Sequence, residues 1–275
     1  MSLVRRIIRR SAAMPLRLLP PADRADVLEA LVSAAIVDSA ANGRVLRFYA
    51  PSSLLRGRAL GLMAKEPDTI DWLNGLGPTD VVWDIGANVG VFSLYAASRG
   101  CRVLAFEPAA ANFFALTRNV ELNALASHVT PYCIAVAGTT ELGVINLDSM
   151  DIGAAMSQFG RPGERSRYSS NPSQPTHGMV GISIDDLVGR FGAPAPTALK
   201  IDVDGLEWPI LQGGLNTLSA PRVHSLLVEL SITDEAERSR AIAWLRERGL
   251  QLASTGQVQG LDRERAANHL FVRRT

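Results

Sequence analysis

A glycine-rich segment between two apolar runs carries the residues best suited to hold a charged small molecule. Residues 81–85 have the β-branched and aromatic composition of a buried strand, and residues 89–98 are expected to form a helix. Between them, Gly86 permits a tight turn, and Gly90 lets the start of the helix pack closely on the strand. This arrangement predicts a cofactor loop, although dinucleotide and mononucleotide sites share the pattern.

The carboxylate of Asp84 discriminates between cofactors, because it lies two residues before the first glycine. A pyrophosphate docked on the helix N-terminus would meet this negative charge, whereas an ammonium and a sulfonium group would be attracted to it. Asp84 therefore favours S-adenosylmethionine over NAD or FAD. Glu107 ends the next apolar run and is expected to face the same crevice, where an acid accepts ribose hydroxyls of either kind of cofactor.

A second set of charged residues follows an apolar run near residues 198–203 and is suited to act on the methyl acceptor. Strand alternation would place Lys200, Asp202 and Asp204 on one side if the strand continues that far. Asp202 is our first choice as the general base or as the group that orients the acceptor. Lys200 could lower the pKa of Asp202 or stabilise a developing alkoxide, and Glu229, near the end of a later strand, completes the catalytic candidates.

Two other uses of these acids stay open. Asp204 and Glu207 could cap the helix that follows them, with Glu229 paired to an arginine. Alternatively, Asp202, Asp204 and Glu229 could hold a hard cation such as Mg²⁺, which would acidify a bound hydroxyl. We rank the base or orienting role first, helix capping second and the metal third, so Mg²⁺ is possible but not favoured and no metal ligand is assigned.

The elements that must position these residues alternate along the chain. Further strands are expected near residues 102–106, 129–136, 225–230 and 269–273, and helices near residues 110–123, 206–218 and 234–248. Strands alternating with helices predict a parallel sheet with helices on both faces, and their nearly continuous apolar character fits strands buried on both sides. A Gly/Ser/Pro/Asn-rich stretch at about 148–178 is expected to form a lid or substrate loop.

Residues 1–55 are expected to form a mainly helical extension or arm before a single domain at 56–275. A helical period runs through residues 23–39, a short strand follows at 45–49, and another helix is expected at 59–75. The arginine-rich first twenty residues have no apolar stretch long enough for a signal peptide or a membrane span. They could touch an anionic membrane as an amphipathic helix, although a packed or disordered arm is favoured.

Composition excludes several classes of protein. A formal net charge of +1 gives no global basic field, so nucleic acid is not expected as a partner. The apolar fraction of 47% can fill a sizeable core. The two cysteines, Cys101 and Cys133, lie in apolar runs and are expected to be free and buried, which indicates a reduced, cytoplasmic protein. Lys65 and Lys200 are the only lysines, and nothing in the sequence indicates the oligomeric state.

Three motifs in chain order resemble those of the FkbM family of methyltransferases. Residues 84–90 read DIGANVG, close to the family's DIGANxG, and Glu107-Pro108 is followed by Asn112 in the second motif. Residues 200–207 read KIDVDGLE, similar to KIDVEGxE, with Asp204 where the family usually has glutamate. Together the motifs lie between residues 79 and 230, a little over half of the chain.

This resemblance implies a Rossmann-like class I methyltransferase fold, with a mostly parallel seven-stranded sheet and helices on both faces. It implies S-adenosylmethionine as the cofactor and O-methylation of a hydroxyl on a small-molecule or glycan acceptor, such as a polyketide or glycolipid. The residues expected to bind the cofactor are Asp84, Gly86, Ala87, Asn88, Gly90, Glu107, Pro108, Asn112 and Asp202.

Two alternatives remain. One is an NAD(P)-dependent oxidoreductase, against which Asp84 and the lack of a Tyr-x-x-x-Lys pair argue. The other is a non-catalytic scaffold with a methyltransferase fold, against which the intact Asp84, Gly86, Gly90 and Glu107 argue.

Overall fold

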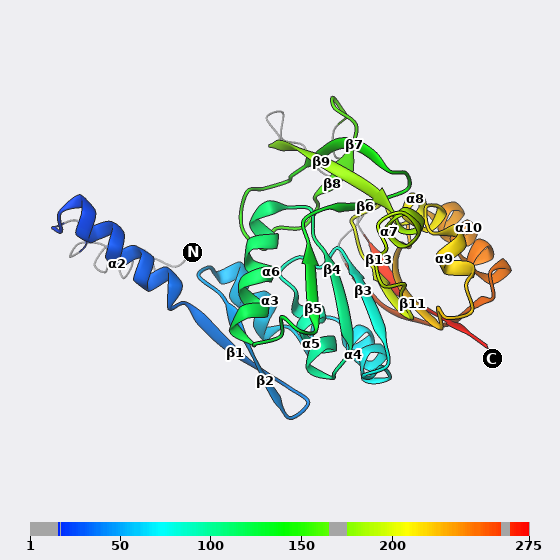
Figure 1. The fold of residues 1–275 in the computed structure, drawn as a ribbon, viewed down its shortest axis with the longest axis horizontal. Coiled ribbons are helices and arrows are strands. Elements are labelled where there is room, and N and C mark those ends of the chain that lie inside the picture. The colour runs from blue at the N-terminus through cyan, green and yellow to red at the C-terminus, as the bar shows by residue number, and fades with distance from the viewer. Residues whose placement is uncertain (1–15, 17, 165–174, 260–264, 275) are drawn as a thin grey trace.

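A computed structural model describes residues 16, 18–164, 175–259 and 265–274 (Figure 1). Its central sheet has seven strands in the order β12-β13-β11-β10-β3-β4-β5. The strands from β5 to β11 in this order are parallel. Strand β13 runs antiparallel to β11, and the edge strand β12 is antiparallel to β13 and therefore parallel to the others. Their bounds are Val81–Ile85 (β3), Arg102–Phe106 (β4), Val129–Tyr132 (β5), Ala198–Ile201 (β10), Ser225–Ser231 (β11), Leu250–Gln259 (β12) and Ala266–Arg273 (β13). The predicted Rossmann-like class I methyltransferase fold is confirmed.

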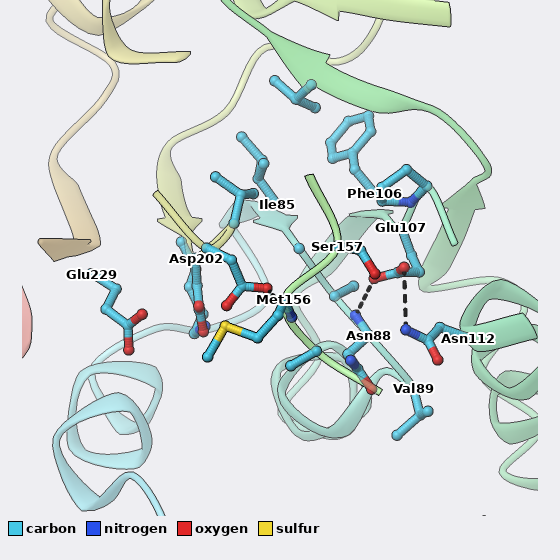
Figure 2. Close-up of a pocket in the computed structure, with 18 of the residues that line it drawn as sticks. Ile85, Asn88, Val89, Phe106, Glu107, Asn112, Met156, Ser157, Asp202 and Glu229 are labelled. Carbon is cyan, nitrogen blue, oxygen red and sulfur yellow. Dashed lines mark hydrogen bonds and ion pairs between the residues drawn. The ribbon is translucent and has the colours of Figure 1, made fainter. Parts of the chain in front are cut away.

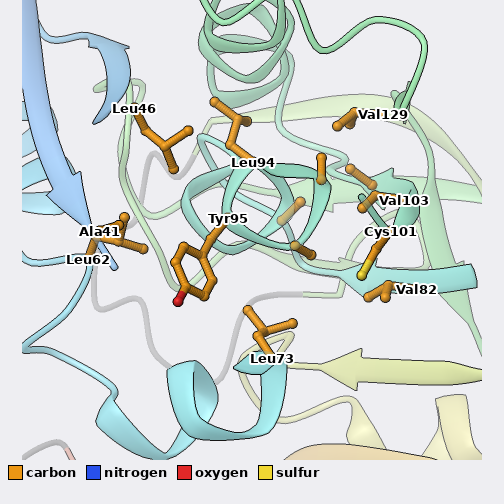
Figure 3. Close-up of a cluster of buried hydrophobic side chains, with 14 of the residues drawn as sticks. Ala41, Leu46, Leu62, Leu73, Val82, Leu94, Tyr95, Cys101, Val103 and Val129 are labelled. Carbon is orange, nitrogen blue, oxygen red and sulfur yellow. The ribbon is translucent and has the colours of Figure 1, made fainter. Parts of the chain in front are cut away.

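Alternation along each strand divides the core into two layers. In β3, Val82 faces one layer, whereas Trp83 and Ile85 face the other. Figure 3 shows the first layer, where Cys101 lies beside Val82 and Leu94 and Tyr95 belong to the same cluster. The helices that cover it are α4 (Pro67–Asn74), α5 (Val91–Ser98) and α6 (Ala110–Leu122). The helices that cover the second layer are α7 (Ile184–Gly189), α8 (Glu207–Gln212), α9 (Leu215–Ser219) and α10 (Glu235–Glu247).

The direction of the connections reverses between β3 and β10, which are direct neighbours. From β3 the chain winds to β4 and β5, and from β10 it winds the other way to β11. Lys200 of β10 pairs in register with Asp84 of β3, so the residues that follow both strands emerge side by side. In an open α/β sheet this reversal point is where a ligand crevice forms.

A second sheet accounts for part of the stretch expected to be a loop. Its four strands, in the order β6-β9-β7-β8, are β6 (Ala135–Ala137), β7 (Glu141–Asn146), β8 (Gln158–Gly160) and β9 (Thr176–Ser183). Within the stretch expected to form a lid or substrate loop, residues 158–160 and 176–178 are strands, because their backbones pair with β7 despite the lack of sequence periodicity. Residues 165–174 of that stretch lie outside the described residues. The strand expected at 129–136 is likewise divided into β5 and β6.

The described part of the N-terminal extension is a helix followed by a hairpin. Helix α2 (Pro21–Ser33) ends earlier than predicted, because β1 (Ile36–Ala41) pairs with β2 (Arg44–Tyr49) across the Asn42-Gly43 turn. Both turn residues have positive φ, as this two-residue hairpin requires. Buried side chains of β2, including Phe48, join the first core layer, so the hairpin is packed onto the domain.

Several other predicted elements differ in their bounds. The helix expected at 59–75 is two helices, α3 (Ser53–Leu60) and α4, and Pro67 opens the second. The helix expected at 206–218 is divided at Gly213-Gly214 into α8 and α9. Cys101 is buried as expected, whereas Cys133 is exposed.

The arginines of the predicted arm, up to Arg17, lie outside the described residues, so their contact with a membrane stays a prediction. Within the described parts of the chain, no helix combines the length and apolar character that crossing a bilayer requires.

Candidate functional site

A cavity of about 310 Å³ lies at the carboxyl ends of the central strands. Its walls are the glycine loop after β3, Glu107 and Pro108 after β4, the segment at 154–157, and the connection from β10 to α8. Glu229 of β11 and residues near α3 close the remaining side (Figure 2). This cavity, called here the inner cavity, has the size of a small-molecule site.

The glycine loop is held in place by its neighbours on both sides. The backbone N–H groups of Gly86 and Ala87 both donate to the carbonyl of Phe106, at 3.0 Å each. Gly86 has φ +87°, and a Cβ there would lie 1.9 Å from the carbonyl oxygen of Asp202. Gly90 has φ +82°, and a Cβ there would lie 2.4 Å from Leu116 Cδ1. Both positions therefore require glycine, one for the approach to β10 and one for the approach to α6.

Glu107 lies beside this loop, as its position at a strand end predicts. Its Oε2 accepts a hydrogen bond from the backbone N–H of Asn88 at 2.8 Å, and its Oε1 accepts from the N–H of Ala109 at 2.8 Å. Asn112 Nδ2 also donates to Oε1, at 3.4 Å (Figure 2). Burial raises the pKa of Glu107 to about 7. The structure thus brings together Asn88, Glu107, Pro108 and Asn112 on one wall.

Asp84 lies behind the loop and is not among the described residues that line the inner cavity. It is 3% exposed, and its Oδ2 accepts a hydrogen bond from Ser93 Oγ at 2.5 Å. Burial raises the pKa of Asp84. Its Oδ1 is buried and has no hydrogen-bond partner among the described residues. Asp84 therefore does not contact the inner cavity directly, and its role in binding a cofactor stays a prediction.

Lys200 and Asp202 form a buried ion pair. Lys200 is 3% exposed, and its Nζ donates to Asp202 Oδ2 at 2.5 Å. Burial opposes charge on both groups, but their attraction outweighs it, so the pKa of Asp202 is lowered and that of Lys200 is raised. Glu66 Oε2, 4.0 Å from Lys200 Nζ, adds to this attraction. Both members of the pair are therefore ionised.

The surroundings of Glu229 favour its protonated form. The charge of Asp202, with burial as the next cause, raises the pKa of Glu229 to about 9. Both carboxyl groups reach the inner cavity (Figure 2). At neutral pH the site therefore holds an ionised Asp202 next to a protonated Glu229.

Asp204 does not continue the line of Lys200 and Asp202, so that expectation is wrong. Strand β10 ends at Ile201, and Asp204 adopts φ +57°, which breaks the alternation. Its Oδ2 accepts from the backbone N–H of Met156 at 2.6 Å, and its carbonyl oxygen accepts from Gln158 Nε2 at 2.6 Å. Burial, and then the charge of Asp202, raise the pKa of Asp204 to about 6. Asp204 lines the cavity as an anchor for the segment at 153–158.

Glu207 stabilises the turn before α8, close to the role that the capping alternative gives it. Its Oε1 accepts from the backbone N–H groups of Val203 and Gly205, at 3.1 Å each. Burial raises the pKa of Glu207 to about 7.

The segment at 153–157, called here the strap, crosses the inner cavity (Figure 2) and is bound by side chains from several elements. Asn112 accepts from the N–H of Gly153 at 2.7 Å and donates to the carbonyl of Ala154 at 3.0 Å. Asn88 Nδ2 donates to the same carbonyl at 2.9 Å, and Arg58 Nε donates to the carbonyl of Gly153 at 2.6 Å. With Asp204, these residues hold the strap at both ends.

Three charged cavity residues were not predicted from the sequence: Arg58, Lys65 and Glu66, from α3 and the segment after it. Burial lowers the pKa of Arg58. One signal was present, because the only two lysines of the chain, Lys65 and Lys200, both line this cavity. Across the described residues, no cluster of three His, Cys, Asp or Glu side chains suited to a metal ion was found.

The seven-stranded sheet, its single antiparallel strand β13 between β12 and β11, and a glycine loop at the reversal point define a class I methyltransferase fold. Residues 84–252 match the model of the methyltransferase FkbM domain, and the chain belongs to that family.

The chain is also similar to individual proteins, at low sequence identity. The chain is 28% identical over 203 residues to a 31-O-demethyl-FK506 methyltransferase FkbM of Streptomyces tacrolimicus, covering 65% of this chain and 75% of that protein. It is 28% identical over 151 residues to a hexuronic acid methyltransferase AglP of Haloferax volcanii, covering 55% of this chain and 56% of that protein. A solved structure, a methyltransferase FkbM of Methylobacillus flagellatus, aligns with a TM-score of 0.46 at 19% identity. That alignment covers 71% of this chain and 44% of the solved one.

Proposed function

We propose that this protein is an S-adenosylmethionine-dependent O-methyltransferase that acts on a hydroxyl of a carbohydrate or natural-product acceptor. The observation that carries the proposal is that one cavity holds both the glycine loop with Glu107 and the Lys200–Asp202–Glu229 group. A cofactor seated on the loop would thus lie against side chains able to orient a hydroxyl and take its proton. The names of two relatives, a 31-O-demethyl-FK506 methyltransferase and a hexuronic acid methyltransferase, support the acceptor class.

The charges of the cavity fit a cationic cofactor. The acids that line it are Glu66, Glu107, Asp202, Asp204 and Glu229, and the bases are Arg58, Lys65 and Lys200. The charge of Asp202 contributes to the raised pKa values of both Asp204 and Glu229, so further negative charge near Asp202 is unfavourable and positive charge is favoured. This argues for a sulfonium and an ammonium, and against the pyrophosphate of the oxidoreductase alternative.

An unsatisfied acceptor on the loop supports the same fit. Asn88 lines the cavity, and its Oδ1 is buried with no hydrogen-bond partner among the described residues. Buried acceptors without a partner are rare, because each costs about 1–3 kcal/mol. A ligand that brings an N–H or O–H donor would satisfy it. When bound, S-adenosylmethionine supplies an electrophilic methyl group.

We assign the acceptor chemistry to Asp202 and Glu229. Asp202, kept ionised by Lys200, accepts a hydrogen bond from the acceptor hydroxyl and so orients the oxygen. Glu229 is the more basic carboxylate once ionised, and it takes the proton as the oxygen forms its bond to the methyl carbon. Positive charge nearby would favour the ionised form of Glu229 that this step needs.

Isothermal titration calorimetry with S-adenosylmethionine, S-adenosylhomocysteine and NAD, with and without Mg²⁺, tests the proposal. We expect both adenosyl ligands to bind and NAD not to bind. Absence of adenosyl binding under every condition would overturn the proposal and leave the oxidoreductase or scaffold alternatives. An acceptor screen with radiolabelled S-adenosylmethionine then tests turnover, and transfer to hydroxyl compounds is the expected result.

A further inference from the structure

A second cavity, of about 410 Å³, lies between the four-stranded sheet and α8. We call it the outer cavity. Strand β6 and the turn after it form one wall, β8 and the residues after it form another, and Pro209, Ile210 and Gln212 of α8 form the third. The function proposed above makes no use of this space.

Two residues, Phe159 and Leu206, line both cavities and so form the partition between them. The ring of Phe159 is held by two glycines of neighbouring strands. A Cβ at Gly143 would lie 2.6 Å from the ring, and a Cβ at Gly181 would lie 2.5 Å from it. The absence of side chains at these two positions lets the ring lie flat over the sheet at the edge of the inner cavity.

The far wall of the outer cavity is also closely built. A Cβ at Gly138 would lie 2.9 Å from the carbonyl oxygen of Pro209, and one at Gly213 would lie 2.6 Å from that of Gly138. The backbone after β6 and the backbone of α8 therefore approach each other as closely as glycine allows. The cavity is thus shaped by backbone contacts, and a ligand would meet a largely preformed surface.

Its lining combines an apolar floor with a charged rim. Phe159, Leu206, Pro209 and Ile210 supply the floor. On the rim, Glu141 Oε1 accepts from Thr139 Oγ1 at 2.8 Å, and Glu141 Oε2 lies 3.8 Å from Arg161 Nε. Glu164 Oε2 accepts from the backbone N–H of Arg161 at 2.8 Å.

This chemistry suits a neutral ring that carries several hydroxyls. Each hydroxyl can donate to a carboxylate and accept from the guanidinium, while the C–H face of the ring covers the apolar floor. A purely apolar ligand would remove the rim charges from water without replacing their hydrogen bonds. A phosphate or carboxylate would face Glu141 and Glu164 against a single arginine, Arg161.

We propose that the outer cavity is the acceptor subsite and binds a neutral pyranose ring. The face of the ring that meets Phe159 and Leu206 is the one nearest the inner cavity, because these two residues also line that cavity. The inference rests on the proposed methyl transfer only in naming the bound ring as the acceptor, since the cavity and its chemistry stand without it.

Saturation-transfer NMR on the full chain tests this subsite directly, with S-adenosylhomocysteine present and absent. The probes are methyl β-D-glucopyranoside, cyclohexylmethanol as an apolar ring, and glucose 6-phosphate as an anionic one. Thr139→Trp fills the outer cavity from its exposed rim. Leu142→Trp is the matched control, because Leu142 is 79% exposed on the adjacent strand and is outside both cavity linings among the described residues.

We expect the pyranoside to receive saturation, Thr139→Trp to weaken its binding about tenfold or more, and Leu142→Trp to leave it unchanged. The double variant Glu141→Gln/Glu164→Gln should weaken it as well, and calorimetric binding of S-adenosylhomocysteine should stay the same in all variants. Pyranoside binding that survives Thr139→Trp, or a preference for either of the other probes, overturns the subsite. If the pyranoside result holds but S-adenosylhomocysteine never binds, the subsite stands and the proposed cofactor function falls.

Discussion

Lys200 Nζ lies 2.5 Å from Asp202 Oδ2, and this contact determines the charge state of Asp202 and, through Asp202, influences that of Glu229. The pair keeps Asp202 ionised at the end of β10, and the charge of Asp202 is the largest cause of the raised pKa of Glu229. A basic strand residue thus sets the protonation of a carboxyl group on the neighbouring strand. The pH dependence of turnover should reveal that relationship.

The rate of methyl transfer should rise with pH as Glu229 loses its proton. Since the pKa of Glu229 is about 9 in the free protein, kcat/KM should increase from neutral pH with a midpoint near pH 9 and level off only above that pH. Asp202→Asn removes the largest cause of that raised value, so the remaining activity should level off at a lower pH. Glu229→Gln should lower kcat/KM by roughly 10²–10⁴ and abolish the rise. Rates measured from about pH 6 to about pH 10 check both effects. An unmoved midpoint in Asp202→Asn would contradict the assigned coupling.

Gly86→Ala should destroy the cofactor loop, because the added Cβ would lie 1.9 Å from the carbonyl oxygen of Asp202. Neither partner can move without breaking the strand pairing, so we expect a loss of more than about 3 kcal/mol in the free energy of unfolding. Binding of S-adenosylhomocysteine should be lost with it. Gly43→Ala is the matched control, since Gly43 has φ +79° but nothing within 4 Å of the added Cβ. That variant should lose only about 1–2 kcal/mol, from backbone strain, and retain binding. Equal effects of the two substitutions, seen by urea denaturation and calorimetry, would show that close packing is not the cause.

Asn112→Ala should release the strap. Asn112 accepts from the N–H of Gly153 and donates to the carbonyl of Ala154, so its loss leaves both backbone groups without these partners. Hydrogen exchange at the amides of residues 153–157 should become faster, and cofactor binding should weaken about tenfold. Asn123→Ala is the control, because Asn123 makes comparable backbone bonds from the same stretch of chain to Arg47 of the N-terminal hairpin. If Asn123→Ala accelerates exchange in the strap as much, the effect is global and the assigned anchoring is wrong.

The local motifs were sufficient to predict which residues form the glycine-loop wall of the inner cavity. Gly86 and Glu107 could be placed because a strand, a tight turn and a helix form from residues adjacent in sequence, and parallel strands bring their ends to one edge. The geometry of Asp204 could not be predicted, because its role depends on whether β10 continues by a few more residues. Bounds of elements are the least predictable feature of a sequence.

Contacts between residues distant in sequence explain the remaining differences between the predicted and the observed structure. Strands β7, β8 and β9 pair although long stretches of chain separate them. Gly143 and Gly181 weaken the sequence pattern of a strand because they make room for the ring of Phe159. Arg58 and Glu66 reach the cavity only because the N-terminal hairpin and α3 pack onto the domain. No local pattern in residues 44–66 marks such contacts, since they depend on side chains that are distant in sequence.

Glu207 should make stability depend on pH in a direction opposite to that of a salt-bridged acid. Its pKa is raised from 4.5 to about 7 by burial, so the folded state binds the proton more tightly than the unfolded state does. The resulting stability is fully present below pH 4.5 and is lost as pH rises through about 7. The difference between the two pKa values corresponds to roughly 3 kcal/mol.

Glu207→Gln keeps an oxygen that can accept from Val203 and Gly205 but carries no charge at any pH. It should match the wild type near pH 5 and exceed it near pH 8.5 by up to roughly 3 kcal/mol in urea denaturation. Glu207→Ala should be less stable at both pH values, by about 1–3 kcal/mol, because those two N–H groups lose their acceptor. Glu121→Gln, on an exposed face of α6, should show no such pH-dependent difference. A gap between Glu207→Gln and the wild type that stays constant with pH would mean that Glu207 does not titrate with a raised pKa.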